Sequence, residues 1–517
     1  VGSEMCIRDR SLLGMMAALI ADKMRPGMVL FSVVVLFLCV GILTPKEMLE
    51  GFSNKGMITV ALLFLVSEGI RQSGTLGQVI KKLLPQGKTT VFKAQLRILP
   101  SVAFISAFLN NTPVVVIFAP IIKHWAKSVK LPATKFLIPL SYVTILGGIC
   151  TLIGTSTNLV VHGMILEAGY EGFTMFELGK VGIFIAIAGI IYLFIFSKRL
   201  LPDARPDTAV PDEEVEEGEK LHRVEAVLGA RFPGINKKLS DFNFQRHYGA
   251  EVKEIKTRNG QRYVDHLEDV VLREGDTLVV MADDTFIPTW GESSVFVLLT
   301  NGNDPDTSGK KKRWLALILL VLMIVGATVG ELPATKEMFP DIKLDMFFFV
   351  CITTIIMAWT NIFPARKYTK YISWDILITI ACAFAISKAM VNSGVADCVA
   401  GFIIGLSDDY GPHVLLAILF VITNLFTELI TNNAAAALAF PLALSISAQL
   451  GVSPTPFFVV ICMAASASFS TPIGYQTNLI VQGIGNYKFT DFVRIGLPLN
   501  IITFLISVIL IPLIWNF

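Results

Sequence analysis

The sequence has little charge for its length. Of its 517 residues, 16% are Asp, Glu, Lys or Arg, whereas 53% are hydrophobic. Soluble globular chains average about 25% charged and about 45–50% apolar residues. This excess of apolar residues is too large for one anchoring helix, so the composition predicts a polytopic membrane protein. The formal net charge of +2 gives no strong field of either sign, which argues against nucleic acid as a partner.

Signatures of enzymes and of metal proteins are also missing. The seven cysteines form no C-x-x-C pair, and their spacing suits neither zinc nor a disulfide framework. All but Cys6 lie in or beside apolar stretches, so we interpret them as small apolar residues. No nucleophile–base set, metal-ligand cluster or phosphate loop stands out. We therefore expect a protein that is not an enzyme and has no cofactor.

Long apolar runs with few charges recur along the chain, and several approach the roughly 20 residues that a membrane-spanning helix needs. The runs cover residues 28–43, 181–197, 314–329, 346–360, 376–386, 414–426 and 495–515. A buried helix in a soluble core could explain one of these runs, but hardly seven. They predict an all-α membrane fold.

The start of the chain does not fit this pattern. Residues 1–10 are polar and charged without the pattern of a signal peptide. The apolar run at residues 11–21 is too short to cross about 30 Å of hydrocarbon. We interpret residues 1–10 as a non-native or disordered start and expect the first membrane part to cover residues 11–197.

The composition changes between the apolar parts. Residues 198–220 form an acidic, proline-containing linker, residues 221–290 suggest a compact α/β module, and residues 291–312 form a second linker before the second membrane part at 313–517. Strands are predicted at residues 251–255 and 277–281, with a turn at 258–260. Basic residues at 198–199 and 310–313 flank the insertion. Because positive charge beside membrane segments marks the cytoplasmic face, we predict a cytosolic module.

The two membrane parts resemble each other in three elements. The matched stretches are residues 66–74 with 386–394, 106–113 with 427–434, and 154–163 with 474–483. Asn111 and Asn158 are 47 positions apart (158 − 111), and Asn432 and Asn478 are 46 apart (478 − 432). Three elements in one order at matched spacing predict an internal repeat.

Each repeat carries Asn-Asn within apolar sequence, where an unpaired amide costs several kcal/mol. Irregular backbone at membrane depth is tolerated only where protein or a water-filled cavity surrounds it. The two interruptions therefore predict one shared site near the midplane. Helix N-termini there suit an anion, and carbonyl, Asn or Thr oxygens suit a hard cation such as Na⁺. Pro113 fits a restarting helix, and Pro472 is placed to open the matching stretch of the second half.

At these residues the chain resembles the divalent anion:sodium symporters, which carry dicarboxylates, citrate or sulfate. Their hallmark is a Ser-Asn-Thr motif at the tip of a re-entrant hairpin in each of two inverted repeats. Residues 110–112 (Asn-Asn-Thr) and 431–433 (Thr-Asn-Asn) stand in those places. The resemblance covers roughly residues 27–197 and 313–517. It implies a multi-pass carrier of the inner (plasma) membrane, working by an elevator mechanism, with Na⁺ as coupling ion, a small divalent anion as substrate and a homodimeric assembly.

The resemblance also implies site residues. Substrate binding would fall to Asn110, Asn111, Thr112, Thr155, Asn158, Thr431, Asn432, Asn433, Pro472 and Asn478. Sodium binding would fall to Ser106, Asn110, Asn111, Gly154, Thr427, Thr431, Asn432 and Ser470. The first motif has Asn110 in place of Ser, and the second continues into alanine, so carboxylate specificity does not carry over. The Asn-rich form is more similar to the branch associated with sulfate.

The inserted module resembles the C-terminal subdomain of RCK regulators, known as TrkA-C. The likeness rests on Leu239, Tyr248-Gly249, Val252, Ile255 and the stretch 275–280 (Gly-Asp-Thr-Leu-Val-Val). No G-x-G-x-x-G occurs in this stretch, so dinucleotide binding has no support. A small-ligand regulatory role and a structural or dimer-forming role both stay open.

Three further side chains and two other functions complete the predictions. Glu428 is a candidate for cation or proton handling, because an intramembrane carboxylate is costly. Glu68 is interpreted as a surface or hairpin-end charge, and His162 as a partner in an interhelical hydrogen bond. A Na⁺/H⁺ antiporter or another anion permease of the same superfamily is the first alternative. A channel or receptor gated through the RCK-like module is the second, although no T-V-G-Y-G-like filter occurs.

Overall fold

The computed structural model describes residues 14, 26–85, 87–203, 222–229, 231–257, 261–283, 286, 290, 295–300, 310–339, 342–405 and 411–517. The predicted start at residues 1–10 and the predicted turn at 258–260 lie outside the described residues, as do most of the two predicted linkers.

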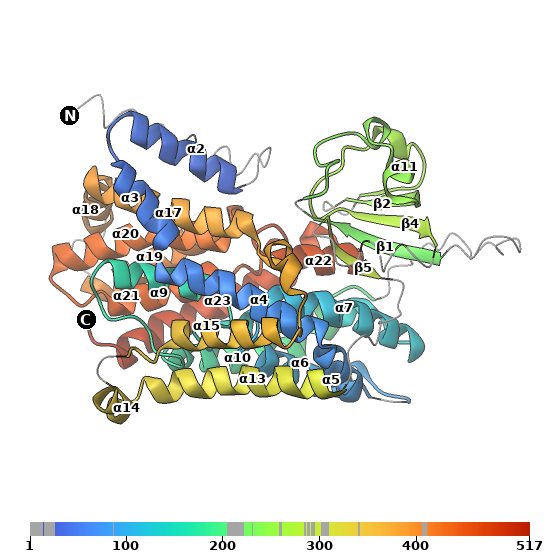
Figure 1. The fold of residues 1–517 in the computed structure, drawn as a ribbon, viewed down its shortest axis with the longest axis horizontal. Helices are drawn as coiled ribbons and strands as arrows, with labels where there is room; N and C mark the ends of the chain where they lie inside the picture. Colours follow the sequence, from blue (N-terminus) through green and yellow to red (C-terminus); the bar gives the residue numbers. More distant parts are fainter. Residues whose placement is uncertain are drawn as a thin grey trace, which may run out of the picture.

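The described helices gather into one large body, and a small sheet stands at one end of it (Figure 1). The first half contains α2 (Pro26–Cys39), α3 (Pro45–Glu50), α4 (Lys55–Gln72), α5 (Thr75–Leu83), α6 (Val91–Ser106), α7 (Asn111–Ser128), α8 (Leu137–Gly148), α9 (Ser156–Glu167) and α10 (Gly179–Leu200). The second half contains α13 (Lys310–Gly330), α14 (Pro333–Met338), α15 (Met346–Trp359), α16 (Tyr368–Tyr371), α17 (Trp374–Asn392), α18 (Val395–Gly405), α19 (Gly411–Leu429), α20 (Asn432–Leu450), α21 (Thr455–Ser466), α22 (Gln476–Gly485) and α23 (Phe489–Ile514).

Seven stretches of the described chain are helical, long and apolar enough to cross a membrane. They are Pro45–Gln72, Gly179–Leu200, Lys311–Gly330, Trp374–Asn392, Gly411–Leu429, Asn432–Leu450 and Phe489–Ile514. Each run predicted from the sequence falls on a helix, but α2 and α15 have only 14 residues each. The sequence analysis missed the first span, which carries Glu68 and Arg71, and the alanine-rich α20.

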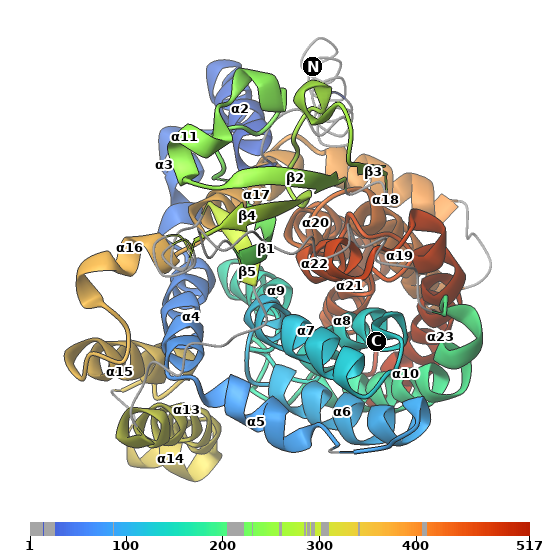
Figure 2. The same cartoon turned by 90° about the vertical axis from the view of Figure 1, so that its right-hand side faces the viewer.

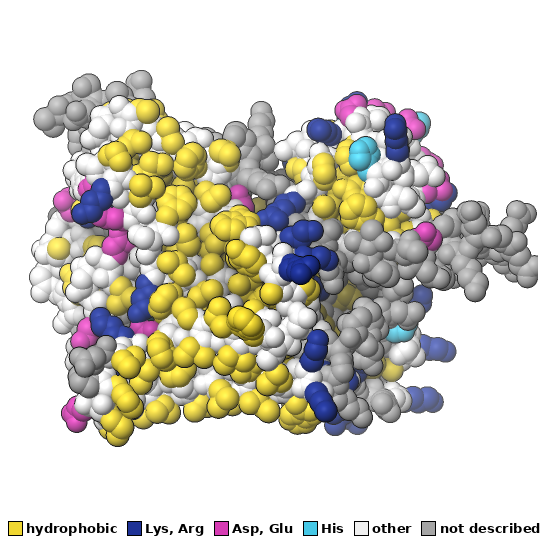
Figure 3. Space-filling model, viewed as in Figure 1, with side chains coloured by type: hydrophobic (Ala, Val, Ile, Leu, Met, Phe, Trp, Pro, Cys, Tyr) yellow, Lys and Arg dark blue, Asp and Glu magenta, His cyan; other side chains and the backbone are white. Residues whose placement is uncertain are grey.

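The outside of the helical body is apolar. On α10, Ile183, Phe184, Ile187, Ile191 and Ile195 are each more than half exposed. Figure 3 shows hydrophobic side chains spread over the helices, with Lys and Arg gathered toward the end where the sheet stands. Soluble monomers rarely expose apolar patches larger than a few hundred Å². The surface therefore supports a polytopic membrane protein.

The inserted segment folds around a five-stranded antiparallel sheet with strand order β3-β2-β4-β1-β5. The strands are β1 (His222–Leu228), β2 (Glu251–Lys256), β3 (Arg262–Tyr263), β4 (Thr277–Ala282) and β5 (Phe296–Thr300), with the short helix α11 (Phe244–Tyr248) between β1 and β2. A separate apolar core includes Leu228, Tyr248, Ile255, Leu278 and Phe296. The two predicted strands are confirmed, whereas β5 lies in the stretch interpreted as a linker, so the sheet extends beyond residue 290.

The sheet packs directly against the helical body at α7 and α22 (Figures 1 and 2). The Lys123 ammonium on α7 lies 3.1 Å from both carboxylate oxygens of Glu225 on β1. The Lys256 ammonium on β2 lies 3.4 Å from one of the same oxygens. One carboxylate thus joins the sheet to a helix of the membrane part.

This ion pair predicts a pH dependence of stability. Burial raises the pKa of the Glu225 carboxyl, but the charges of Lys123, Lys256 and Arg223 outweigh burial and lower the pKa from 4.5 to about 2. Because the folded-state pKa is depressed, the contribution to stability is complete above about pH 4.5 and is lost as the pH falls toward 2. The wild type should therefore unfold at a higher temperature than Glu225→Gln at pH 7, and thermal scans should show this difference shrinking below pH 4.5. A difference independent of pH would contradict the prediction.

Candidate functional site

Each Asn-Asn motif lies where one helix ends and the next begins. Helix α6 ends at Ser106 and α7 begins at Asn111, while α19 ends at Leu429 and α20 begins at Asn432. Pro113 falls in the first turn of α7, where its missing N–H costs no helical hydrogen bond. The predicted interruptions are therefore breaks between helices, and each break leaves backbone N–H groups without an intrahelical partner.

The two breaks share one hydrogen-bond pattern. The Ser106 hydroxyl lies 2.8 Å from Asn111 Oδ1 and 2.9 Å from the Thr144 carbonyl oxygen. The Thr427 hydroxyl lies 2.7 Å from Asn432 Oδ1 and 2.6 Å from the Ala465 carbonyl oxygen. The separations in sequence, 5 and 38 residues, are the same in both halves.

A second pair of breaks also matches. Helix α8 ends at Gly148 and α9 begins at Ser156, while α21 ends at Ser466 and α22 begins at Gln476. The Asn158 amide donates to the Thr151 carbonyl at 2.9 Å, and the Asn478 amide donates to the Thr471 carbonyl at 3.2 Å, both across seven residues. Each asparagine therefore holds the unwound segment that precedes its own helix.

Gly474 shows how tightly the second unwound segment is packed. A Cβ at this position would lie 2.0 Å from the Ser468 hydroxyl and 2.3 Å from the Thr427 carbonyl oxygen. Only glycine lets the segment approach Thr427 this closely. Gly154, at the matching place in the first half, donates its N–H to the Thr151 hydroxyl at 3.1 Å.

Tyr475 joins the two halves. The Asn111 amide donates to the Tyr475 hydroxyl at 2.6 Å, and the Thr155 hydroxyl lies 2.9 Å from it. Gly474, the residue before Tyr475, packs against Thr427, whose hydroxyl donates to Asn432 Oδ1. Tyr475 is 8% exposed, and Asn111 is fully buried. The neighbourhoods of Asn111 and Asn432 thus meet along the segment Gly474–Tyr475 in the protein interior.

Three further hydrogen bonds cross between the halves in a reciprocal way. The Thr112 hydroxyl donates to Gln476 Oε1 at 3.4 Å. In the other direction, Asn433 Oδ1 accepts from the Ser156 hydroxyl at 3.3 Å and from the Thr157 hydroxyl at 3.2 Å. The motif of each half therefore contacts the helix start of the other half. As a result, the N-termini of α7, α9, α20 and α22 come together.

This arrangement offers two kinds of binding chemistry. Helix N-termini carry unpaired N–H groups and a partial positive charge, which favour an anion. The oxygens around Ser106 and Asn111, and those around Thr427 and Asn432, suit a hard cation. Thr431 Oγ1 is buried without a hydrogen-bond partner among the described residues.

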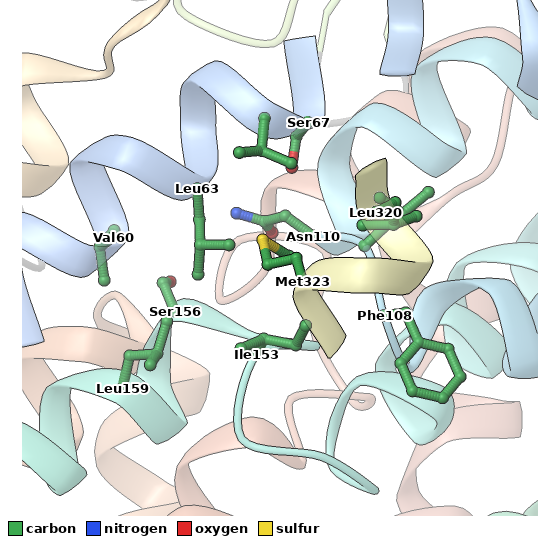
Figure 4. Close-up of a pocket in the computed structure, with 12 residues that line it drawn as sticks. Val60, Leu63, Ser67, Phe108, Asn110, Ile153, Ser156, Leu159, Leu320 and Met323 are labelled. Carbon is green, nitrogen blue, oxygen red and sulfur yellow. The ribbon is translucent and has the colours of Figure 1, made fainter. Parts of the chain in front are cut away.

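Not every predicted site residue lies in these clusters. Asn110 lines a pocket with Ser67 of α4, Ser156 of α9 and apolar side chains of α13 (Figure 4). Ser470 lies beside Glu428 and Asn500, and Pro472 is buried in the unwound segment. The structure thus brings Asn111, Thr112, Asn432 and Asn433 together and places Asn110 and Ser470 beside them in separate surroundings.

Glu428 lies next to the second motif. Its Oε1 accepts from the Ser470 backbone N–H at 2.9 Å and from the Asn500 amide at 2.7 Å. Glu428 Oε2 and Asn500 Oδ1 are buried, and neither has a partner within the described part of the chain. A buried carboxylate oxygen without a hydrogen-bond partner is costly, and binding a cation would remove this cost.

The other two singled-out side chains differ. Glu68 accepts from Arg71 at 2.6 Å and from Gln72 at 2.6 Å, but its side chain is 13% exposed, so it is a largely buried, paired charge and not the surface charge expected. The interhelical hydrogen bond expected for His162 is not found: its Nδ1 is buried without a partner among the described residues. The ring instead packs against Gly172, where no side chain is available to bond it.

Sequence reasoning missed Tyr475, Gln476 and Asn500. A signal existed for the first of these, because the internal repeat places Tyr475 opposite Thr155, inside an otherwise matched stretch. No signal marked Asn500, which lies within a long apolar helix and reaches Glu428 only through the fold.

The role of Tyr475 can be tested with Tyr475→Phe. The ring is kept, but the Asn111 amide loses its acceptor, and an unpaired buried group costs about 1–3 kcal/mol. We expect the free energy of unfolding to fall by about that amount, as measured by thermal unfolding of the purified protein. Tyr170→Phe, at a tyrosine that is 45% exposed, is the control and should have no effect. If both variants were as stable as the wild type, the Tyr475 hydroxyl would make no contribution to the free energy of unfolding.

Comparison with known proteins identifies the chain's relatives. The pattern of the citrate transporter family matches residues 16–446 and 338–517. An uncharacterized transporter of Synechocystis is 30% identical, across 94% of this chain and 93% of its own length. The uncharacterized transporter YfbS of Escherichia coli is 26% identical across 98% of both chains. Sodium/sulfate cotransporter 2 of Chlamydomonas reinhardtii is 30% identical over 54% of this chain and 31% of its own length. The family pattern matches most of the chain, and the Synechocystis relative aligns with it over nearly its whole length, so this chain belongs to the citrate transporter family of membrane-integral transporters.

Proposed function

We propose that the protein is a sodium-coupled symporter of a small divalent anion, with sulfate the first candidate and a dicarboxylate the second. The observation that carries the proposal is the meeting of four helix N-termini, two from each half, through the contacts of Tyr475 and Asn433. The partial positive charge of these termini favours a dianion. The relative named as a sodium/sulfate cotransporter supports the choice of sulfate and sodium.

Sodium would bind at the two matched oxygen clusters, one around Ser106 and Asn111 and one around Thr427 and Asn432. Inward movement of one cation is worth about 2.3 kcal/mol per 100 mV of membrane potential. Two sodium ions balance the charge of a dianion, so that their concentration gradient alone would drive uptake, and a third sodium ion would add the membrane potential. The remaining predicted ligands, Thr155, Asn158, Asn478 and their neighbours, would shape the anion site from the unwound segments.

The matched hydrogen bonds of the two halves support a pair of repeats in this proposal, which we place in inverted orientation across the membrane. We further propose an elevator-type motion, a homodimer, and a plasma-membrane location with the sheet module in the cytosol. The gathering of Lys and Arg toward the sheet supports the cytosolic placement (Figure 3). The RCK-like assignment of the module rests on its sequence pattern alone.

Uptake into proteoliposomes tests the proposal. Labelled sulfate, and in parallel labelled succinate, should accumulate when sodium is higher outside, and accumulation should stop when potassium replaces sodium. Protein-free liposomes are the control. Uptake that needs no sodium, or accumulation of neither anion, would refute the symporter.

A sodium/proton antiporter is the second candidate, because Glu428 has one buried oxygen without a partner among the described residues. In the same vesicles, an antiporter would release protons when sodium is added, without any anion requirement. Proton release strictly dependent on sulfate or succinate would instead favour coupled anion transport.

A further inference from the structure

The sheet module contacts two particular helices of the membrane part. Helix α7 begins at Asn111 and α22 begins at Gln476, so both begin at the proposed anion site. The contacts of the module lie further along the same helices, at Lys123 and around Gly483. At about 1.5 Å per residue, Lys123 is about 18 Å from the start of α7. The module therefore touches α7 far from its site end and lies along α22 from the first turn onward.

The contact with α7 is a buried charge network. Glu225 is 13% exposed, Lys256 is 5% exposed and Lys123 is 24% exposed, so the network is largely shielded from water. A buried carboxylate is stable only when it is paired and hydrogen-bonded. Lys123 supplies two of the three contacts that Glu225 makes with these lysines.

The contact with α22 depends on close approach. A Cβ at Gly483 would lie 2.3 Å from the Thr277 hydroxyl of β4, so only glycine permits the strand to come so near. Gly275, two residues before Thr277, lies against the Leu479 side chain. Strand and helix are therefore in direct contact rather than joined through a linker.

The same interface contains an unsatisfied polar group. Thr277 Oγ1 is buried without a hydrogen-bond partner among the described residues. This hydroxyl opposes docking, because it would regain water on separation. The charge network and the close packing hold the module in place, while this hydroxyl favours its release.

We propose that the sheet module is a brace that fixes α7 against α22 through the Lys123–Glu225 and Thr277–Gly483 contacts and so sets the affinity of the anion site. The helices transmit the position of the brace to the contacts Asn111–Tyr475 and Thr112–Gln476 at their site ends. The Thr112–Gln476 hydrogen bond is long, at 3.4 Å, so a small shift of either helix would strengthen or break it. Lys123 is in this view a positioning residue.

Lys123→Glu tests the brace by placing two carboxylates face to face. Hydrogen–deuterium exchange of the full-length protein should speed up at least fivefold in β1 and in α22, with no change in α10. In sodium-driven sulfate uptake, the half-saturating concentration should rise about tenfold, while the maximal rate stays within about twofold. Lys123→Arg, which keeps the positive charge, should behave as the wild type in both readouts.

The matched control is Lys238→Glu, which breaks an exposed ion pair with Asp269 (3.0 Å) on the same module. It should leave exchange and half-saturation unchanged. Unchanged exchange in Lys123→Glu would overturn the docking, and faster exchange with unchanged half-saturation would overturn the brace. The affinity measurement rests on the proposed function, but the exchange measurement does not. A wild type that transports no anion would thus refute the function without deciding the docking.

Discussion

Asn111→Ala and Asn432→Ala should each reduce sodium-driven anion uptake by at least tenfold. Each alanine removes the amide oxygen that accepts from Ser106 or Thr427, and Asn111→Ala also removes the amide that donates to Tyr475. A hydrogen bond or contact to a charged ligand is worth about 1.5–3 kcal/mol, and about 1.4 kcal/mol corresponds to a factor of ten in binding. Loss of one ligating amide therefore predicts a loss of roughly ten- to a hundredfold. Initial rates of sulfate uptake in proteoliposomes measure the effect.

A matched control separates the site from asparagine in general. Asn392 ends α17 on the surface, where its amide donates to Glu47 at 2.9 Å. Asn392→Ala should leave the initial rate within about twofold of the wild type. Thermal unfolding of the purified variants shows whether either site variant has simply lost its fold. Folded Asn111→Ala and Asn432→Ala proteins with normal uptake would remove the basis of the proposed site.

Glu428→Gln should raise the sodium concentration needed for half-maximal uptake by about tenfold or more. The amide keeps the size of the side chain and can still accept from Ser470 and Asn500 through its carbonyl oxygen. It cannot, however, supply the negative charge. No basic residue of the described chain forms an ion pair with Glu428, so a bound cation is the natural counter-charge.

Glu68→Gln is the comparison for this second prediction. Glu68 already has Arg71 and Gln72 as partners, so its loss should not alter the sodium dependence. Sodium titrations of sulfate uptake at fixed membrane potential give the measurement. If Glu428→Gln shows the sodium dependence of the wild type, the carboxylate is structural and serves only to accept the hydrogen bond from the Ser470 backbone N–H.

The sequence alone predicted much of this architecture. Long apolar runs require helices, because a backbone in hydrocarbon must satisfy its own hydrogen bonds. The matched spacing of Asn111–Asn158 and Asn432–Asn478 predicted two related halves, and the same hydrogen bonds recur in both. Pro113 correctly marked a helix start, because proline is tolerated in a first turn. Local periodicity and local chain chemistry were sufficient for these features.

Contacts between residues far apart in the chain could not be predicted from the sequence. Tyr475 meets Asn111 across 364 positions, and Asn500 meets Glu428 across 72. Nothing in the local pattern fixes such pairs, because each depends on how whole helices pack. The docking of Glu225 on Lys123 has the same origin, as does the lack of a partner for His162 Nδ1 among the described residues. The sequence by itself thus determined the apolar helices, the repeated motifs and the resemblance to a transporter family. Only tertiary packing decided which polar side chains share a site, because burial and pairing are properties of the assembled fold.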